Sequence, residues 1–190
     1  MRYLALGDSY TIGTGASDPS RSWPSIIAAR LGAELTNPAV NGYTTEDLIR
    51  DELSLVRQLA PDLVTVLIGV NDLVQGRGTE AYRGSLRRIY DELAGTRVVA
   101  VSIPTWAYVP AAAGFGGAAH VEILTQLFNL VAQEEAAARG FTWVDVGPVS
   151  TSEVGSDGWI AADGLHPGDA QYAAWAEVIW LALSDLQGGH

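Results

Sequence analysis

Short apolar runs alternate with longer segments of helical period along this sequence, and that alternation limits the folds open to the chain. Five runs are predicted to be strands, at residues 3–6, 33–36, 63–68, 98–103 and 142–146. Five segments are predicted to be helices, at residues 24–31, 45–59, 79–93, 119–139 and 170–186. Strands that alternate with helices indicate a parallel sheet covered on both faces. We therefore predict an α/β fold, a three-layer α/β/α sandwich around a flavodoxin-like parallel sheet of about five strands.

The size and composition of the chain fit one domain. It has 190 residues, of which 48% are hydrophobic and 17% charged. This is enough apolar material for a large core, which excludes intrinsic disorder as the main state. No linker, repeat or low-complexity tract divides the chain, so we predict a single domain over residues 1–190. The lack of cysteine excludes disulfides, thiolate zinc sites and cysteine catalysis.

The charge of the chain argues against two classes of partner. Eleven arginines, no lysine and 22 acidic residues give a net charge of −11, which repels nucleic-acid phosphates and anionic membrane surfaces. Residues 98–119 carry no charge, but their prolines and glycines are incompatible with a membrane-spanning helix. No basic region precedes a long apolar run at the N-terminus. We therefore predict no nucleic-acid partner, no membrane span and a location in the cytoplasm.

The residues that follow the predicted strands are candidates for a functional site, because ligands of open parallel sheets bind beyond the carboxyl ends of the strands. The first three such loops read Gly7-Asp8-Ser9-Tyr10, Asn41-Gly42-Tyr43 and Gly69-Val70-Asn71-Asp72. A strand order of 2-1-3 makes these loops neighbours. The last strand is followed by a long connection to Asp163-Gly164-Leu165-His166-Pro167, and its length allows it to return over the same edge.

Together these residue types support nucleophilic acyl transfer. The hydroxyl of Ser9 becomes an effective nucleophile when an imidazole accepts its proton, and His166 is the candidate base. Asp163, three residues before His166, is the candidate carboxylate that fixes the imidazole tautomer and stabilises the imidazolium. A tetrahedral intermediate also needs donors for its oxyanion. The candidate donors are the backbone N–H groups of Ser9 and Gly42 and the side-chain amide of Asn71.

The four blocks resemble, in order and spacing, those of the SGNH, or GDSL-type, hydrolases, and they span residues 5–167. The resemblance implies the three-layer fold of that family, with Ser9 as the nucleophile, His166 as the base and Asp163 as its partner. It also implies an oxyanion hole from Ser9, Gly42 and Asn71, a small-molecule ester as the substrate, and no metal or cofactor. One departure is Tyr10, which stands where the GDSL motif has leucine. That position bears on packing beside the nucleophile and not on the reaction.

Other polar residues have ordinary structural interpretations. Asp8 and Asp72 follow strands and are interpreted as hydrogen-bonding within their own turns. A two-metal phosphoesterase needs more imidazoles than this chain has, since only His120 and His190 accompany His166.

The aromatic residues fall into two groups. Those at strand or helical spacing are interpreted as core: Trp143, Trp175 and Trp180. Those in the uncharged loop either line an apolar substrate entrance or pack within the loop itself: Trp106, Tyr108 and Phe115.

We therefore predict a metal-independent serine esterase that hydrolyses carboxylic esters through an acyl-enzyme. The alternatives on the same site are a carbohydrate O-acetylesterase, a lysophospholipase, a thioesterase and an acyltransferase. A non-catalytic binding module is a further alternative, although no catalytic residue of the motif is missing. The Gly-x-Ser-x-Gly elbow of another serine hydrolase class is absent around Ser9. The acyl chain length, the alcohol and the oligomeric state stay open.

Overall fold

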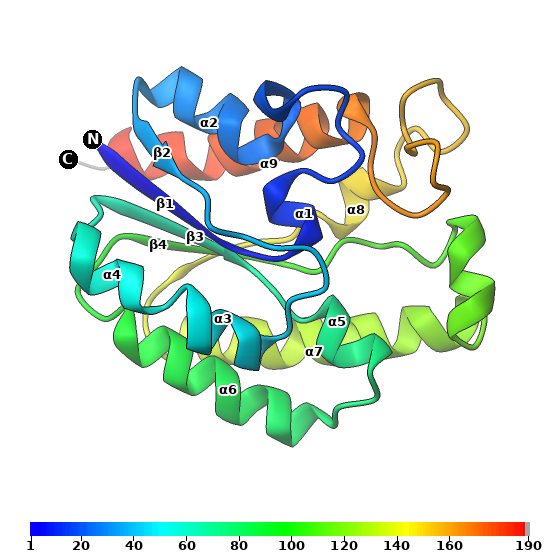
Figure 1. The fold of residues 1–190 in the computed structure, drawn as a ribbon, viewed down its shortest axis with the longest axis horizontal. Helices are drawn as coiled ribbons and strands as arrows, with labels where there is room; N and C mark the ends of the chain where they lie inside the picture. The colour runs from blue at the N-terminus through cyan, green and yellow to red at the C-terminus, as the bar shows by residue number, and fades with distance from the viewer. Residues whose placement is uncertain (189–190) are drawn as a thin grey trace.

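Five parallel strands form one sheet in the order β2-β1-β3-β4-β5 in the computed structural model, which describes residues 1–188 (Figure 1). The strands are β1 (Arg2–Gly7), β2 (Glu34–Thr36), β3 (Leu63–Leu67), β4 (Val98–Val101) and β5 (Thr142–Val144). Leu4 of β1 pairs with Thr36 on one side and with Val64 on the other. The predicted sheet is confirmed, and its order makes the loops after the first three strands neighbours. His190 lies outside the described residues.

Helices cover both faces of the sheet, so the molecule has three layers (Figure 1). One face carries α1 (Ser9–Ile12), α2 (Trp23–Leu31), α8 (Gly147–Ser150) and α9 (Asp169–Gly188). The other carries α3 (Thr45–Asp51), α4 (Ser54–Leu59), α5 (Val70–Val74), α6 (Thr79–Glu92) and α7 (Ala118–Ala137). All residues of β3 and β4 are buried, as expected for strands covered on both faces.

The helix predicted at residues 45–59 is two helices, α3 and α4. It begins as expected, because Thr44 and Asp47 form a capping box at the start of α3. The break comes at Glu52 and Leu53, where the Leu53 N–H bonds to the Leu48 carbonyl, one residue beyond the regular α-helical partner. At this break the Glu52 carboxyl group turns inward and accepts the Gly7 N–H at 3.0 Å. A contact with a residue 45 positions away leaves no trace in local periodicity.

The uncharged stretch at residues 98–119 is β4, an extended loop and the short 3-10 helix η2 (Pro110–Phe115), ending in the first turn of α7. A second 3-10 helix, η1 (Pro19–Arg21), precedes α2. Within residues 1–188, no helix has both the length and the apolar character needed to cross a bilayer.

The tryptophans interpreted as core differ in burial. Trp175 is fully buried and packs edge-on against Tyr10, with ring centroids 5.7 Å apart. Trp143 is partly buried and packs against the core, whereas Trp180 is partly buried and lies at its margin, so only Trp175 is a fully buried core residue. The contact with Trp175 explains the aromatic residue at position 10, since Tyr10 anchors the first turn of α1 in the core.

Candidate active site

Ser9 is the first residue of α1 and follows β1 after a tight turn. The Asp8 carboxylate caps this helix by accepting the Tyr10 N–H at 3.0 Å. Gly7 is required here, because a Cβ at this position would lie 2.4 Å from the Leu67 carbonyl oxygen of the neighbouring strand. The turn therefore brings the backbone of β1 against β3 and leaves Ser9 at the carboxyl edge of the sheet, 7% exposed.

The loop that contains Gly42 is fastened to α1. Asn37 donates its side-chain amide to the Thr11 carbonyl at 2.8 Å, and the Thr14 hydroxyl donates to the side chain of Asn41. Gly42 has a φ of +82°, a conformation that favours glycine. Among the described residues, the backbone N–H groups of Ser9 and Gly42 donate to no protein acceptor. Both donors are therefore free to bind a ligand.

Asn71, in the first turn of α5, joins the three loops. Its side-chain nitrogen lies 2.9 Å from the Tyr43 carbonyl oxygen, next to Gly42, and 3.4 Å from an Asp8 carboxylate oxygen, next to Ser9. The structure thus brings the loops of Ser9, Gly42 and Asn71 together. The part of Tyr43 was not predicted, because a backbone carbonyl gives no signal in the sequence.

Asp163 and His166 form a hydrogen-bonded pair in the loop before α9. The His166 Nδ1 atom lies 2.6 Å from Asp163 Oδ2, while Asp163 Oδ1 accepts the N–H groups of Leu165 and His166 at 2.9 and 3.0 Å. Partial burial raises the pKa of Asp163, but the hydrogen bonds from His166 and the backbone outweigh it and hold this pKa below its usual value. The carboxylate is therefore held ionised and fixed against the ring.

The loop of His166 packs over α1. The imidazole lies edge-on to the ring of Tyr10, the neighbour of Ser9, with centroids 6.1 Å apart. No hydrogen bond between the Ser9 hydroxyl and the imidazole occurs in the part of the chain that the structure describes. In unliganded enzymes such contacts are often long and tighten only with substrate. The fold thus brings the loop of His166, near the C-terminus, against the helix of Ser9, near the N-terminus, without a hydrogen bond between the two side chains.

Buried carboxyls behind Ser9 were not foreseen. Asp8 is fully buried and burial raises its pKa to about 7, while burial raises the pKa of Glu52 to about 8. Asp72 was predicted to hydrogen-bond within its own turn, but its carboxylate instead accepts the N–H and hydroxyl of Thr45 at 2.8 and 2.6 Å. It also pairs with Arg77 at 3.0 Å. Asp8 keeps the expected bond within its turn and adds the contact to Asn71.

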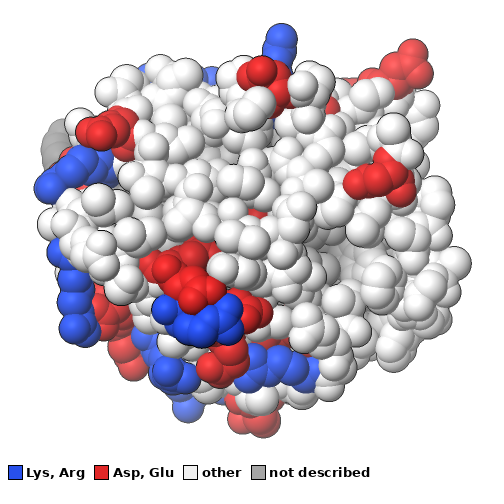
Figure 2. All heavy atoms as spheres, in the orientation of Figure 1, with Lys and Arg blue, Asp and Glu red and all other residues white. Residues whose placement is uncertain are grey.

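The three aromatic residues of the uncharged loop, Trp106, Tyr108 and Phe115, differ in their burial and contacts. Trp106 is buried and donates its indole N–H to Thr125, so of the two alternatives it packs inside the protein and does not line an entrance. The Tyr108 hydroxyl accepts a hydrogen bond from Gln171. Phe115 is 39% exposed and lines an apolar depression of about 250 Å³ together with Leu73, Val74, His120 and Leu124. The face of the molecule near these loops is hollowed and mostly free of charged side chains (Figure 2).

Among residues 1–184, whose side chains the structure describes, no group of three or more histidine, aspartate or glutamate side chains is suited to a metal ion.

Comparisons with known proteins identify the family to which the chain is similar. The model of the GDSL-like Lipase/Acylhydrolase family matches residues 5–174. The chain is 25% identical to Esterase TesA of Pseudomonas aeruginosa over 194 residues, which cover 96% of this chain and 88% of that protein.

Solved structures show the same fold. The lipase/acylhydrolase from Enterococcus faecalis is 24% identical, with a TM-score of 0.78 and coverage of 98% of this chain and 97% of that one. The carbohydrate acetylesterase family member from Sinorhizobium meliloti is 19% identical, with a TM-score of 0.78 and coverage of 99% and 100%.

Proposed function

Because this chain belongs to the GDSL-like lipase/acylhydrolase family, we propose that it is a serine esterase that hydrolyses carboxylic esters through an acyl-enzyme on Ser9. The observation that carries the proposal is the 2.6 Å pair of Asp163 and His166, which lies against the helix that begins at Ser9. The hollowed, uncharged surface nearby suits a neutral ester (Figure 2).

The proposed reaction has two steps. The Ser9 oxygen attacks the ester carbonyl carbon while its proton passes to His166, and that proton then leaves with the alcohol. Nδ1 of the ring is bound to Asp163, so Nε2 is the nitrogen left to accept the proton. Water next attacks the acyl-enzyme with His166 again as the base, which releases the acid and restores Ser9.

The oxyanion of both intermediates is proposed to bind the N–H groups of Ser9 and Gly42 and the amide of Asn71. The two backbone donors are unengaged among the described residues, which supports this role. The Asn71 amide has two N–H bonds. The Tyr43 carbonyl accepts one of them at 2.9 Å, whereas the other makes only a long contact of 3.4 Å with Asp8, which an oxyanion would replace.

Covalent labelling tests the nucleophile. A p-nitrophenyl phosphonate ester should add one phosphonyl group per chain, with Ser9 as the labelled residue in peptide mapping, because the reagent traps an activated serine. Ser9→Ala should abolish the adduct, whereas Ser152→Ala, at an exposed position in the loop after α8, should leave it unchanged. An adduct on another residue, or none, contradicts the proposal.

The substrate class needs a separate experiment. One relative is an esterase and one structural neighbour is a carbohydrate acetylesterase family member, so simple esters and acetylated sugars are the first candidates. The candidate substrate classes are ranked by their rates of hydrolysis, with Ser9→Ala as the blank. The panel consists of p-nitrophenyl esters, acetylated sugars, lysophospholipids and acyl thioesters. A new ester formed with an added alcohol would instead indicate an acyltransferase.

We also propose that residues 1–190 act as one domain, since one hydrophobic cluster includes residues from the sheet and from helices on both of its faces. A location in the cytoplasm stays a prediction, which cell fractionation would test.

A further inference from the structure

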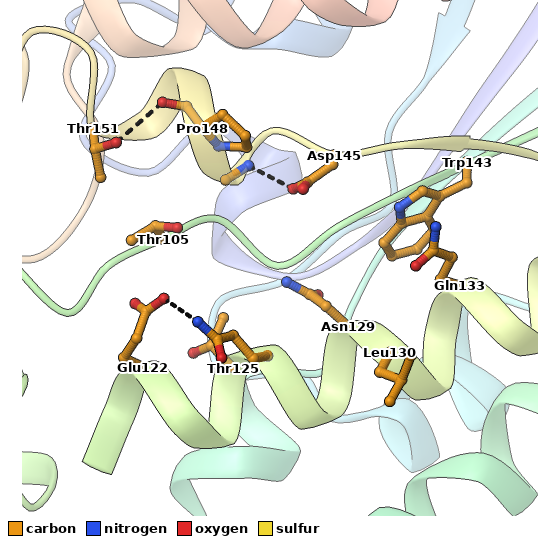
Figure 3. A pocket seen from close by; sticks show the side chains of 12 residues that line it. Thr105, Glu122, Thr125, Asn129, Leu130, Gln133, Trp143, Asp145, Pro148 and Thr151 are labelled. Atoms are coloured by element: carbon orange, nitrogen blue, oxygen red, sulfur yellow. Dashed lines mark hydrogen bonds between the residues drawn. The ribbon is translucent and has the colours of Figure 1, made fainter. Parts of the chain in front are cut away.

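A groove of about 560 Å³ runs along the free edge of the sheet, beside β5 (Figure 3). One wall is α7, and the other is formed by β5, α8 and the loop after β4. Gln133 lies next to Trp143 at one end, and Glu122 lies near Thr105 at the other (Figure 3). None of the lining residues is among those proposed for hydrolysis, so the groove is a separate feature of the molecule.

Two of its polar side chains are held in place by the backbone. Asn129 of α7 bonds to both the N–H and the carbonyl of Ile103, each at 2.8 Å. Asp145 accepts the Ser102 hydroxyl at 2.9 Å and the Gly147 N–H at 2.8 Å, both on Oδ1. The groove is therefore preorganised, which lowers the entropic cost of binding.

Other polar atoms of the groove are unengaged. Four groups have no hydrogen-bond partner among residues 1–184, whose side chains are described: Asp145 Oδ2, Glu122 Oε2, the Thr105 hydroxyl and the Gln133 amide. These groups offer two charged acceptors, a hydroxyl and an amide that both donates and accepts. Trp143, only partly buried, adds a flat apolar surface among them.

This chemistry selects among ligand classes. An anion would face two carboxylates, and the lining includes no arginine. An apolar ligand would remove these polar groups from water without replacing their hydrogen bonds, which costs free energy. A sugar supplies hydroxyl donors to the carboxylates, accepts from Gln133 and places the C–H face of its ring on the indole. We propose that the groove binds a neutral saccharide of one or two rings, independently of the hydrolytic reaction.

Ligand-detected saturation-transfer NMR on the full chain tests this proposal. The probes are cellobiose, maltose and N,N′-diacetylchitobiose, with glucosamine and glucuronate as the cationic and anionic comparisons. We expect at least one neutral disaccharide to bind with a Kd of about 1 mM, as a small open site allows. Glucuronate should bind more weakly than the neutral sugar, because its carboxylate would lie near Asp145 and Glu122.

Three variants locate the binding. Trp143→Leu should weaken it roughly tenfold, the loss of one stacking contact. Gln133→Ala, at an exposed position that is safe for folding, should weaken it as well. Trp180→Leu is the matched control, because Trp180 is also partly buried but lies on α9 beside Arg30, and it should bind as the wild type does.

Several results would overturn the proposal. One is no saturation transfer to any of the three neutral sugars at about 10 mM, a concentration well above the expected Kd. Another is binding unchanged in both Trp143→Leu and Gln133→Ala. Tighter binding of glucosamine would indicate an amine site, and equal binding of glucuronate would contradict the role of the two carboxylates. Ester hydrolysis by each variant is measured in parallel and should match the wild type, which separates this proposal from the hydrolytic one.

Discussion

Glu52 is a carboxyl group buried next to the turn that carries Ser9. It is 1% exposed, one of its oxygens accepts the Gly7 N–H, and the other has no partner in the described part of the chain. Burial raises its pKa to about 8, and the nearby Asp8 charge adds to this, while the bond from Gly7 opposes it. The turn is therefore supported by a carboxyl that stays protonated at neutral pH.

Replacing Glu52 by glutamine should change how stability depends on pH. The ordinary glutamate value of 4.5 applies in the unfolded chain, so between about pH 4.5 and pH 8 the folded protein binds more protons. The contribution of Glu52 to the free energy of unfolding is fully present below about pH 4.5 and is lost as the pH rises towards about 8. The glutamine of Glu52→Gln cannot ionise. We therefore expect the free energy of unfolding to fall less between these pH values in the variant than in the wild type, with a difference on the order of 2 kcal/mol.

Urea unfolding near both ends of the range measures this difference. Glu153→Gln, the same change at an exposed loop position, is the control and should follow the wild type. If the free energy of unfolding changed with pH by the same amount in the wild type and in Glu52→Gln, the expectation would be contradicted.

Asn71→Ala removes the side-chain donor proposed for the oxyanion. We expect kcat to fall roughly 100- to 1000-fold with little change in KM, because the donor acts mainly on charge that develops in the transition state. Asn129→Ala is the control, since Asn129 also donates its amide to a backbone carbonyl, that of Ile103, but has no proposed catalytic role. Steady-state kinetics on a p-nitrophenyl ester compare the two. A rise in KM alone would place Asn71 in substrate binding instead.

Among the elements, those with several turns or a continuous apolar run were predictable. Periodicity located the five strands and the long helices, and the residues after the strands formed the candidate site. The helices α1, α5 and α8 were missed, because four or five residues are too short to show a period. The break between α3 and α4 and the burial of Asp8 depend on contacts between distant segments, which no local pattern records.

Glu135 joins α6 to α7 through a buried ion cluster. It is 5% exposed and pairs with Arg83 and Arg87 of α6 and with Arg139 just beyond α7. Burial raises its pKa, but the arginines outweigh this and lower it to about 2. Its contribution to stability is therefore present above the ordinary value of 4.5 and is lost as the pH falls towards about 2.

Removing this carboxylate should loosen the contact between the two helices. We expect Glu135→Ala to cost about 2–4 kcal/mol at neutral pH, since it removes the buried carboxylate that Arg83 and Arg139 share and leaves them only exposed acidic partners such as Glu134 and Asp91. The difference in free energy of unfolding between Glu135→Ala and the wild type should become smaller in acid, as Glu135 of the wild type becomes protonated. Glu134→Ala is the control, because Glu134 is half exposed and its pair with Arg83 should contribute less than about 1 kcal/mol. Chemical denaturation at neutral and acidic pH measures both, and equal costs for the two variants would argue against the cluster.

Charge is unevenly spread over the whole molecule. The net charge is −11, yet charged side chains gather over α3, α4 and α6, while the hollowed face near the loops after the strands is mostly uncharged (Figure 2). A substrate that approaches this face therefore meets few charged side chains, and the main electrostatic influence on it is the negative field of the whole protein.

That field should make the enzyme prefer neutral esters over anionic ones. We expect kcat/KM for p-nitrophenyl butyrate to exceed that for p-nitrophenyl hemisuccinate several-fold at low ionic strength, because the second substrate is repelled during approach. The ratio should narrow as ionic strength rises from about 0.01 M to about 1 M, where the screening length falls from about 30 Å to about 3 Å. Hydrolysis of the same pair by free imidazole corrects for their intrinsic reactivity. A corrected ratio that does not change with salt would mean that discrimination comes from contacts within the site and not from the charge of the protein as a whole.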